Sequence, residues 1–194
     1  ALPKLYEKLS IGTSPHNFRG IFAYRNFWIQ NEAREFYVKA DSEWFCFDLA
    51  KGRPGKITEE LIAPFKERED VLHLSPLQRK IAFPESYQEG EPIPVVQDFL
   101  DTNHHMNNAK YIALAEEVIF QCTGKPAILF TEGEEKADSK REFYSIRAEY
   151  VKAYTLGDSI FPRVAIEEDR TVVAFYNQNK ELCCHVEIRK NPDA

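Results

Sequence analysis

The chain has 194 residues, of which 43% are hydrophobic and 13% aromatic, and its formal net charge is −6 at pH 7. The length fits one large domain or two small ones, with enough apolar residues for a real core. The negative charge argues against general nucleic-acid binding, which needs a basic surface. No apolar run is long enough to cross a membrane.

The first part of the chain has the pattern of β-strands. An aromatic-rich segment at 21–29 is followed by a polar turn at 31–35. Apolar and polar residues then alternate over 36–46, which predicts a strand with one buried face. Residues 51–55 contain two glycines and a proline that end this strand, and Thr58 is the expected N-cap of a short helix.

The segment 66–92 is charged and contains several prolines, which argue against a continuous helix or strand. We interpret it as a linker. The sequence therefore predicts a first domain at 1–65 and a second domain at 93–194.

The second part opens with an acid, amides and imidazoles that directly precede a helical pattern. If residues 101–105 are extended, Asp101, Asn103 and His105 point to one face. They then lie at a helix start, where free N–H groups and the helix dipole favour developing negative charge. Acyl transfer needs such groups. The alternative, which the residues alone favour, is a polar turn that only caps the helix.

The helix itself is expected at 111–122, where apolar residues recur with helical period. Asn107 or Asn108 is the expected N-cap, and Gly124 is positioned to end the helix. Further strands are expected at 146–150, 172–176 and 182–188.

The segment that begins at Asp101 resembles the acyl-acyl-carrier-protein thioesterase family, in the form of its bacterial-type members. The family pattern D-x-N-x-H-x-N-N-x-x-Y is met at every defined position, by Asp101, Asn103, His105, Asn107, Asn108 and Tyr111. Segments at 4–13, 25–27, 42–44 and 52–54 resemble the strands and a turn of the family's first domain. The resemblance implies an α+β fold of two tandem hotdog domains, in which antiparallel sheets wrap around central helices.

The two halves also echo each other with an offset of about 150 residues, which is typical of two related domains. Projected back by this offset, the first domain's helix would fall before Ala1. We therefore expect that the chain is truncated and that its first domain lacks the opening strand and the central helix.

The resemblance implies that a fatty acyl thioester of acyl carrier protein is hydrolysed, as in fatty acid biosynthesis, and that free fatty acid is released. Asn103 is then the orienting amide, and Asp101 or His105 is the base, a choice that stays open. No cofactor is implied. A metal at His104 and His105 lacks a third ligand at useful spacing. The expected places of His104, His16, His73 and His185 are the surface or a polar face.

The chain departs from the family at Ala153 and Tyr154, where plant members have glutamate and cysteine. Glu149 would lie roughly 13 Å away along a strand and is no direct substitute. The missing acid leaves open the alternative of a catalytically weak acyl-binding protein. An acyl-CoA thioesterase, which would differ only in the group that carries the acyl chain, is a second alternative. The four cysteines lack metal-ligand spacing and are typical of reduced thiols in a cytoplasmic protein: Cys46, Cys122, Cys183 and Cys184.

Substrate and partner contacts complete the predicted site. The acyl chain is expected in an apolar pocket of the first domain, with Asn107, Asn108 and Tyr111 also contacting substrate; the aromatic candidates, each of which could instead be ordinary core, are Trp28, Phe36, Trp44 and Phe45. Acyl carrier protein is acidic, so an acidic enzyme needs a local basic face, for which the candidates are Lys110, Arg147 and Lys152. A homodimer is left open.

Overall fold

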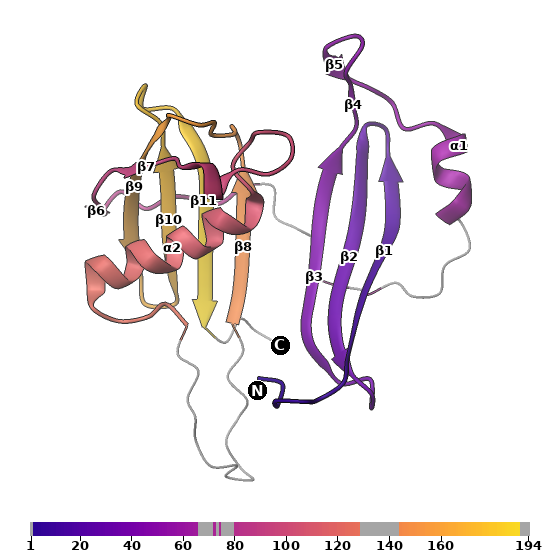
Figure 1. Cartoon of the computed structure of the whole chain (residues 1–194), viewed down its shortest axis with the longest axis horizontal. Helices are drawn as coiled ribbons and strands as arrows, with labels where there is room; N and C mark the ends of the chain where they lie inside the picture. Colours follow the sequence, from indigo (N-terminus) through magenta and orange to yellow (C-terminus); the bar gives the residue numbers. More distant parts are fainter. Residues whose placement is uncertain (1, 66–71, 73, 75–79, 129–143, 191–194) are drawn as a thin grey trace. The chain divides into compact units, whose positions relative to one another are not determined.

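The computed structural model of the protein describes residues 2–65, 72, 74, 80–128 and 144–190. The chain divides into two units, Ala1–Leu77 and Gln78–Ala194. Each unit has its own antiparallel sheet, as Figure 1 shows. In the described part of the chain no helix is long and apolar enough to cross a membrane.

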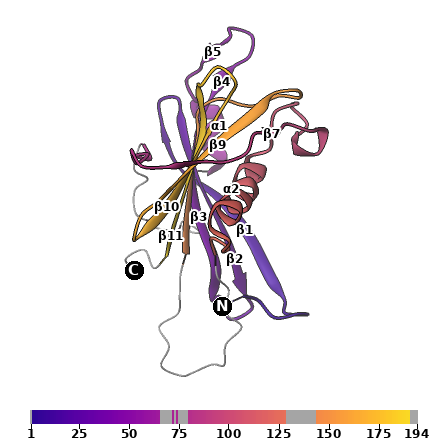
Figure 2. The ribbon, with the colours of Figure 1, turned by 90° about the vertical axis from the view of Figure 1, so that its left-hand side faces the viewer.

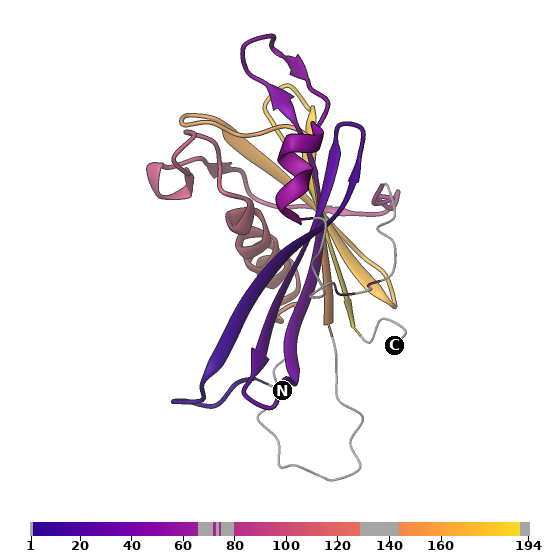
Figure 3. The same cartoon turned by 90° about the vertical axis from the view of Figure 1, so that its right-hand side faces the viewer.

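Unit 1 is built on a three-stranded sheet with the order β1-β2-β3. Its strands are β1 (Leu9–Arg19), β2 (Phe22–Asn31) and β3 (Phe36–Phe45), followed by the short pair β4 (Phe47–Asp48) and β5 (Arg53–Pro54). The helix α1 (Glu59–Ile62) and the 3-10 turn η1 (Ala63–Phe65) follow (Figures 1 and 3); Thr58 is at the N-cap position of α1, but its side chain makes no capping hydrogen bond. The strands expected at 21–29 and 36–46 are thus confirmed, and so is the start of a short helix after Thr58, although the threonine side chain does not cap it.

One face of this sheet is apolar but open. Ile11, Ile29 and Val38 lie directly opposite one another on the three strands, and Trp44 shares their face. Ile11 is 81% exposed and Trp44 52% exposed. The prediction that the strand at 36–46 has a buried face is therefore wrong for the described residues, since alternation shows which side chains share a face but not what covers them.

Unit 2 contains a larger antiparallel sheet with the order β6-β9-β10-β11-β8, and β7 also pairs with β9. The strands are β6 (Gln88–Glu89), β7 (Ile93–Pro94), β8 (Tyr144–Tyr150), β9 (Ser159–Ile166), β10 (Arg170–Tyr176) and β11 (Leu182–Lys190). The 3-10 turn η2 (Gln97–Phe99) leads towards the helix α2 (Asn108–Thr123), which lies against one face of the sheet (Figures 1 and 2). This is the hotdog arrangement that the family resemblance implies.

The helix α2 confirms the predicted helix and both of its ends. The Asn107 side chain accepts a hydrogen bond from the Ala109 N–H, and Gly124 ends the helix with a left-handed φ of 68°. This conformation is one that glycine adopts without steric cost. The buried stripe of Tyr111, Ala115, Val118 and Ile119 packs against apolar residues of the sheet, among them Ile160, Val164, Val173, Phe175, Cys184, Val186 and Ile188.

Residues 80–92, which the sequence assigned to the linker, belong to unit 2. Ile81 is buried, and both β6 and β7 pair with β9. Prolines exclude a long element here, but they allow paired strands of two residues. Most of the remaining predicted linker, 66–71, 73 and 75–79, lies outside the described residues, and the domain boundaries at 65 and 93 stay predictions.

Candidate functional site

The segment that carries the family pattern is a closed turn. The Asp101 carboxylate accepts hydrogen bonds from the backbone N–H groups of Asn103, at 2.8 Å, and His105, at 3.3 Å. The backbone N–H of Asp101 donates to the His105 carbonyl, and His104 has a left-handed φ of 60°. The extended conformation, under which Asp101, Asn103 and His105 would share one face, is therefore not formed, and the alternative of a polar turn before the helix is what the structure has. Aspartate side chains bond nearby backbone groups and so compete with extended pairing.

These hydrogen bonds also determine the charge of the turn. The N–H of Asn103, followed by that of His105, holds the pKa of Asp101 below its usual value. Asp101 is therefore ionised at neutral pH and serves first to shape the turn. The Asn103 and His105 side chains are exposed, so both can meet a substrate.

The turn is fixed at its end to the core of unit 2. Met106 is buried and forms an isolated β-bridge with Leu100, and the Asn107 N–H donates to the Phe99 carbonyl at 2.8 Å. The Met106 N–H donates to the Tyr154 carbonyl at 2.9 Å. The loop after β8 thus lies beside the turn, although the two are almost 50 residues apart in sequence.

The other residues of the family pattern hold the start of α2. Asn107 is the N-cap, and the Asn108 carbonyl accepts a hydrogen bond from the Tyr150 hydroxyl at 3.0 Å. Tyr111 is buried in the core, and its hydroxyl accepts from the Tyr154 N–H at 3.3 Å. These contacts are structural, and a role for the three residues in substrate binding stays a prediction.

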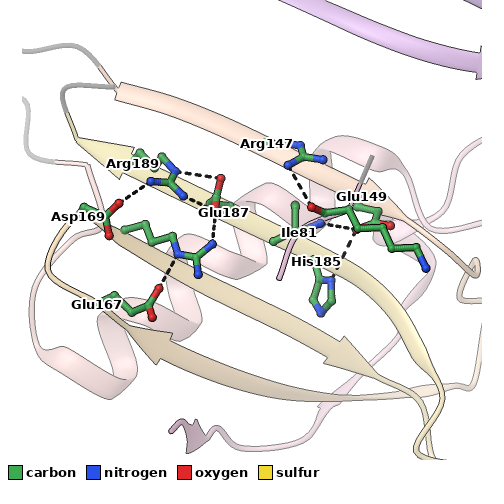
Figure 4. Close-up of polar contacts among 10 residues, drawn as sticks. Ile81, Arg147, Glu149, Glu167, Asp169, His185, Glu187 and Arg189 are labelled. Carbon is green, nitrogen blue, oxygen red and sulfur yellow. Dashed lines mark hydrogen bonds and ion pairs between the residues drawn. The ribbon is translucent and has the colours of Figure 1, made fainter. Parts of the chain in front are cut away.

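The two positions that depart from the family lie next to this site. Ala153 is exposed and contributes no acid. Tyr154 is fully buried, stacks on Tyr111 with ring centroids 5.9 Å apart, and its hydroxyl has no hydrogen-bond partner among the described residues. Glu149 does not replace the missing acid, because its carboxylate accepts from the Ile81 N–H on the sheet face opposite α2 (Figure 4).

The four aromatic candidates of unit 1 do not share one face of its sheet. Trp28 pairs with Gly12 and packs over it so closely that a Cβ there would lie 2.1 Å from the indole. By the strand register Phe36 and Phe45 lie on the same side as Trp28, whereas Trp44 lies on the other. A single pocket lined by all four is not formed by this sheet alone.

All three candidate docking residues already have partners. Lys110 pairs with Asp98 at 2.6 Å, Lys152 with Glu181, and Arg147 donates to the Lys80 carbonyl at 3.5 Å. The exposed ion pairs of Lys110 and Lys152 contribute little to stability. Lys110 is in the first turn of α2. It is the nearest of the three in sequence to the turn at residues 101–105, which we call the motif turn.

Sequence reasoning missed two clusters in which a histidine lies beside a carboxylate. His185 lies on the polar face of the sheet, next to Glu149, as one of its two expected places, but it is buried there and not at the surface. In unit 1, His16 and the fully buried Asn26 both contact the Asp41 carboxylate, and Asn26 also accepts from the Leu72 N–H. Strand alternation could have indicated the faces of these residues, but not their partners.

The described residues contain no cluster of three or more histidine, cysteine, aspartate or glutamate side chains that could hold a metal ion. A cavity of about 530 Å³ in unit 2 lies away from the motif turn, and its lining includes Gly90, Pro162, Arg163, Tyr176 and Lys180.

Comparisons with known proteins identify relatives of both sequence and fold. Residues 1–65 match the model of the acyl-ACP thioesterase N-terminal domain, and no curated protein sequence matches the chain. An acyl-ACP thioesterase from Bacteroides thetaiotaomicron is similar in structure, with a TM-score of 0.70 and 18% identity over 95% of this chain and 69% of that one. A 12:0-ACP thioesterase from Umbellularia californica has a TM-score of 0.65 and 16% identity over 98% of this chain and 70% of its own.

The double hotdog fold and the resemblance to the acyl-ACP thioesterase family are thereby confirmed. Together the family model and the fold support a hydrolase that acts on thioesters.

Proposed function

We propose that this protein hydrolyses fatty acyl thioesters of acyl carrier protein at the turn formed by residues 101–105. The observation that carries the proposal is the complete family pattern, folded as a closed turn that exposes Asn103 and His105 just before α2. The match of residues 1–65 to the family model supports it.

The chemistry follows from the groups at the turn. The start of α2 provides partial positive charge, and the Asn103 amide can donate to the thioester oxygen as it becomes negative. His105 is the proposed base, which takes a proton from the attacking water and returns it to the sulfur when the C–S bond breaks. Asp101 is the positioning residue, because its carboxylate holds the backbone of both other residues.

A second function, acyl binding without hydrolysis, is favoured by one observation. The backbone of Tyr154 is bonded to Met106 and to Tyr111, so residue 153 lies beside the turn, and there this chain has alanine where plant family members have an acid. A site without that acid can still hold an acyl chain.

The test is acyl hydrolysis by the purified full chain with C8 to C18 acyl groups, each linked either to acyl carrier protein or to CoA. Released fatty acid is measured by mass spectrometry, because the free thiols of the protein would react with thiol reagents. Faster hydrolysis of the carrier-protein substrates supports the proposal. Equal or faster hydrolysis of the CoA substrates supports an acyl-CoA thioesterase, and binding without release supports the acyl-binding function.

Variants locate the activity. Asn103→Ala and His105→Ala should each lower turnover at least tenfold. The matched control is His104→Asn, in the same turn, because asparagine tolerates the left-handed conformation that His104 adopts. If the parent and all three variants have the same turnover, the site lies elsewhere.

A further inference from the structure

The segment of residues 80–87, which we call the strap, lies on the face of the unit 2 sheet opposite α2. The Ile81 N–H donates to the Glu149 carboxylate at 2.9 Å, and the Lys80 carbonyl accepts from Arg147. Phe83 stacks flat on His185, with ring centroids 5.7 Å apart and an interplanar angle of 7°. At its other end, Tyr87 lies under the Arg163 guanidinium. Figure 4 shows Ile81, Glu149 and His185 close together.

The imidazole of His185 lacks the partners that a charged ring would need. The residue is 7% exposed, and neither ring nitrogen has a hydrogen-bond partner among the described residues. Its Nδ1 lies 3.8 Å from Glu149 Oε2, which is too long for a hydrogen bond. Burial lowers the pKa of His185 below its ordinary value of 6.5, and the Glu149 charge only partly opposes this.

Among the charged groups around His185, Glu149 is the carboxylate that lies beside its ring. On the same strand, Glu187 is paired with Arg170 at 2.8 Å and with Arg189 at 3.1 Å (Figure 4). These arginines also pair with Glu167 and Asp169. From β8 come Glu149 and Arg147, and the β10 residue opposite His185 is the uncharged Ala174.

We propose that His185 and Glu149 form a pH-sensitive latch that holds the strap at neutral pH and releases it on acidification. An imidazolium under Phe83 is shielded from water, whereas release of the strap lets water reach it. The imidazolium also attracts the same Glu149 oxygen that accepts from the Ile81 N–H. This inference is independent of thioester hydrolysis.

The direction of the pH effect follows from linkage. With the strap in place His185 has the lower pKa, so the released state binds the proton more tightly. The closed position of the strap is therefore most stable above pH 6.5, and its stability relative to the released state falls as the pH drops below 6.5. The equilibrium constant for release rises by at most about tenfold per pH unit, until the closed state is protonated as well.

The test is hydrogen exchange of the full chain, followed by mass spectrometry at pH 7.5, 6.5 and 5.5 and corrected for the intrinsic pH dependence of amide exchange. Peptides that cover the strap should exchange up to about fivefold faster at pH 5.5 than at pH 6.5, because a group with a pKa of 6.5 in the released state is already half protonated at pH 6.5. Peptides from β10 should change less than twofold. If the corrected exchange rate of the strap peptides does not change with pH, or if the β10 peptides accelerate as much, the latch proposal is wrong.

Variants separate His185 from other titrating groups. His185→Phe keeps a ring against Phe83 but cannot be protonated, so the rise should disappear; His185→Gln tests the same point if the first variant folds poorly. Glu149→Gln retains an oxygen for the Ile81 N–H and removes the charge that favours the imidazolium, so the rise should be at least as large. The control His16→Gln, in unit 1, should leave the rise unchanged. Persistence of the full rise in both His185 variants refutes the proposal.

Discussion

Removing the hydroxyl of Tyr154 should stabilise the protein. This side chain is fully buried, and its hydroxyl has no hydrogen-bond partner among the described residues. The neighbouring Cys183 thiol is only a weak hydrogen-bonding group. Tyr154→Phe retains the stacking on Tyr111, and the hydrogen bonds of residue 154 to Met106 and Tyr111 use backbone atoms. The substitution therefore removes only the unpaired hydroxyl.

The magnitude follows from the cost of burying an unpaired hydroxyl, which is about 1–3 kcal/mol. We expect the free energy of unfolding to rise by about 1 kcal/mol or more, seen as a higher midpoint of urea unfolding with an unchanged m-value. Tyr150→Phe is the matched control, since the same atom is removed but the Tyr150 hydroxyl donates to the Asn108 carbonyl at 3.0 Å. It should lower the free energy of unfolding by about 0.5–1.5 kcal/mol. Two variants that shift the midpoint in the same direction would refute this reasoning.

Three further predictions concern the motif turn and its surroundings. Asn107→Ala removes the cap of α2 and should lower the free energy of unfolding in urea by about 1 kcal/mol. Asn107→Asp keeps a side-chain oxygen that can cap the helix, so it should lower this free energy much less. Ala153→Glu adds a carboxylate beside the turn and should raise turnover at least tenfold in the fatty acid assay, with Ala153→Gln as the uncharged control. Lys110→Glu should slow hydrolysis of carrier-protein substrates, as should added salt in the parent, and leave CoA substrates almost unchanged; equal loss on both would assign Lys110 to the fold or the chemistry.

The helix α2 shows what the sequence could predict. Its apolar period, its cap at Asn107 and its end at Gly124 are local signals, and all three agree with the structure. The strands expected at 146–150, 172–176 and 182–188 are confirmed for the same reason, because each carries its own alternation or β-rich composition.

The motif turn shows where local signals end. The same residues fit both an extended segment and a capping turn, and the decision depends on whether the Asp101 carboxylate bonds its own backbone. Composition cannot decide this competition. The family resemblance grouped these residues as a candidate site, which stays a prediction, but it carried no information about their backbone.

Nor could the sequence predict the partners of the buried polar groups. Alternation in β11 places His185 and Glu187 on one face, but the stacking of Phe83 on His185 joins residues about 100 positions apart. The open face of β3 is a similar case, since Val38 and Trp44 have the pattern of core residues while lying exposed.

The position of the strap also determines when its contacts can form during synthesis. Residues 80–87 leave the ribosome well before β8, β9 and β11, which supply Glu149, Arg163 and His185. The Ile81 N–H has no acceptor until β8 has been made, and Phe83 has no ring to stack on until β11 has followed. Pairing of such distant segments is slow and leaves apolar surface exposed. A nascent chain that stalls after β10 therefore lacks the strand that joins β10 to β8, and it exposes apolar surface that favours aggregation.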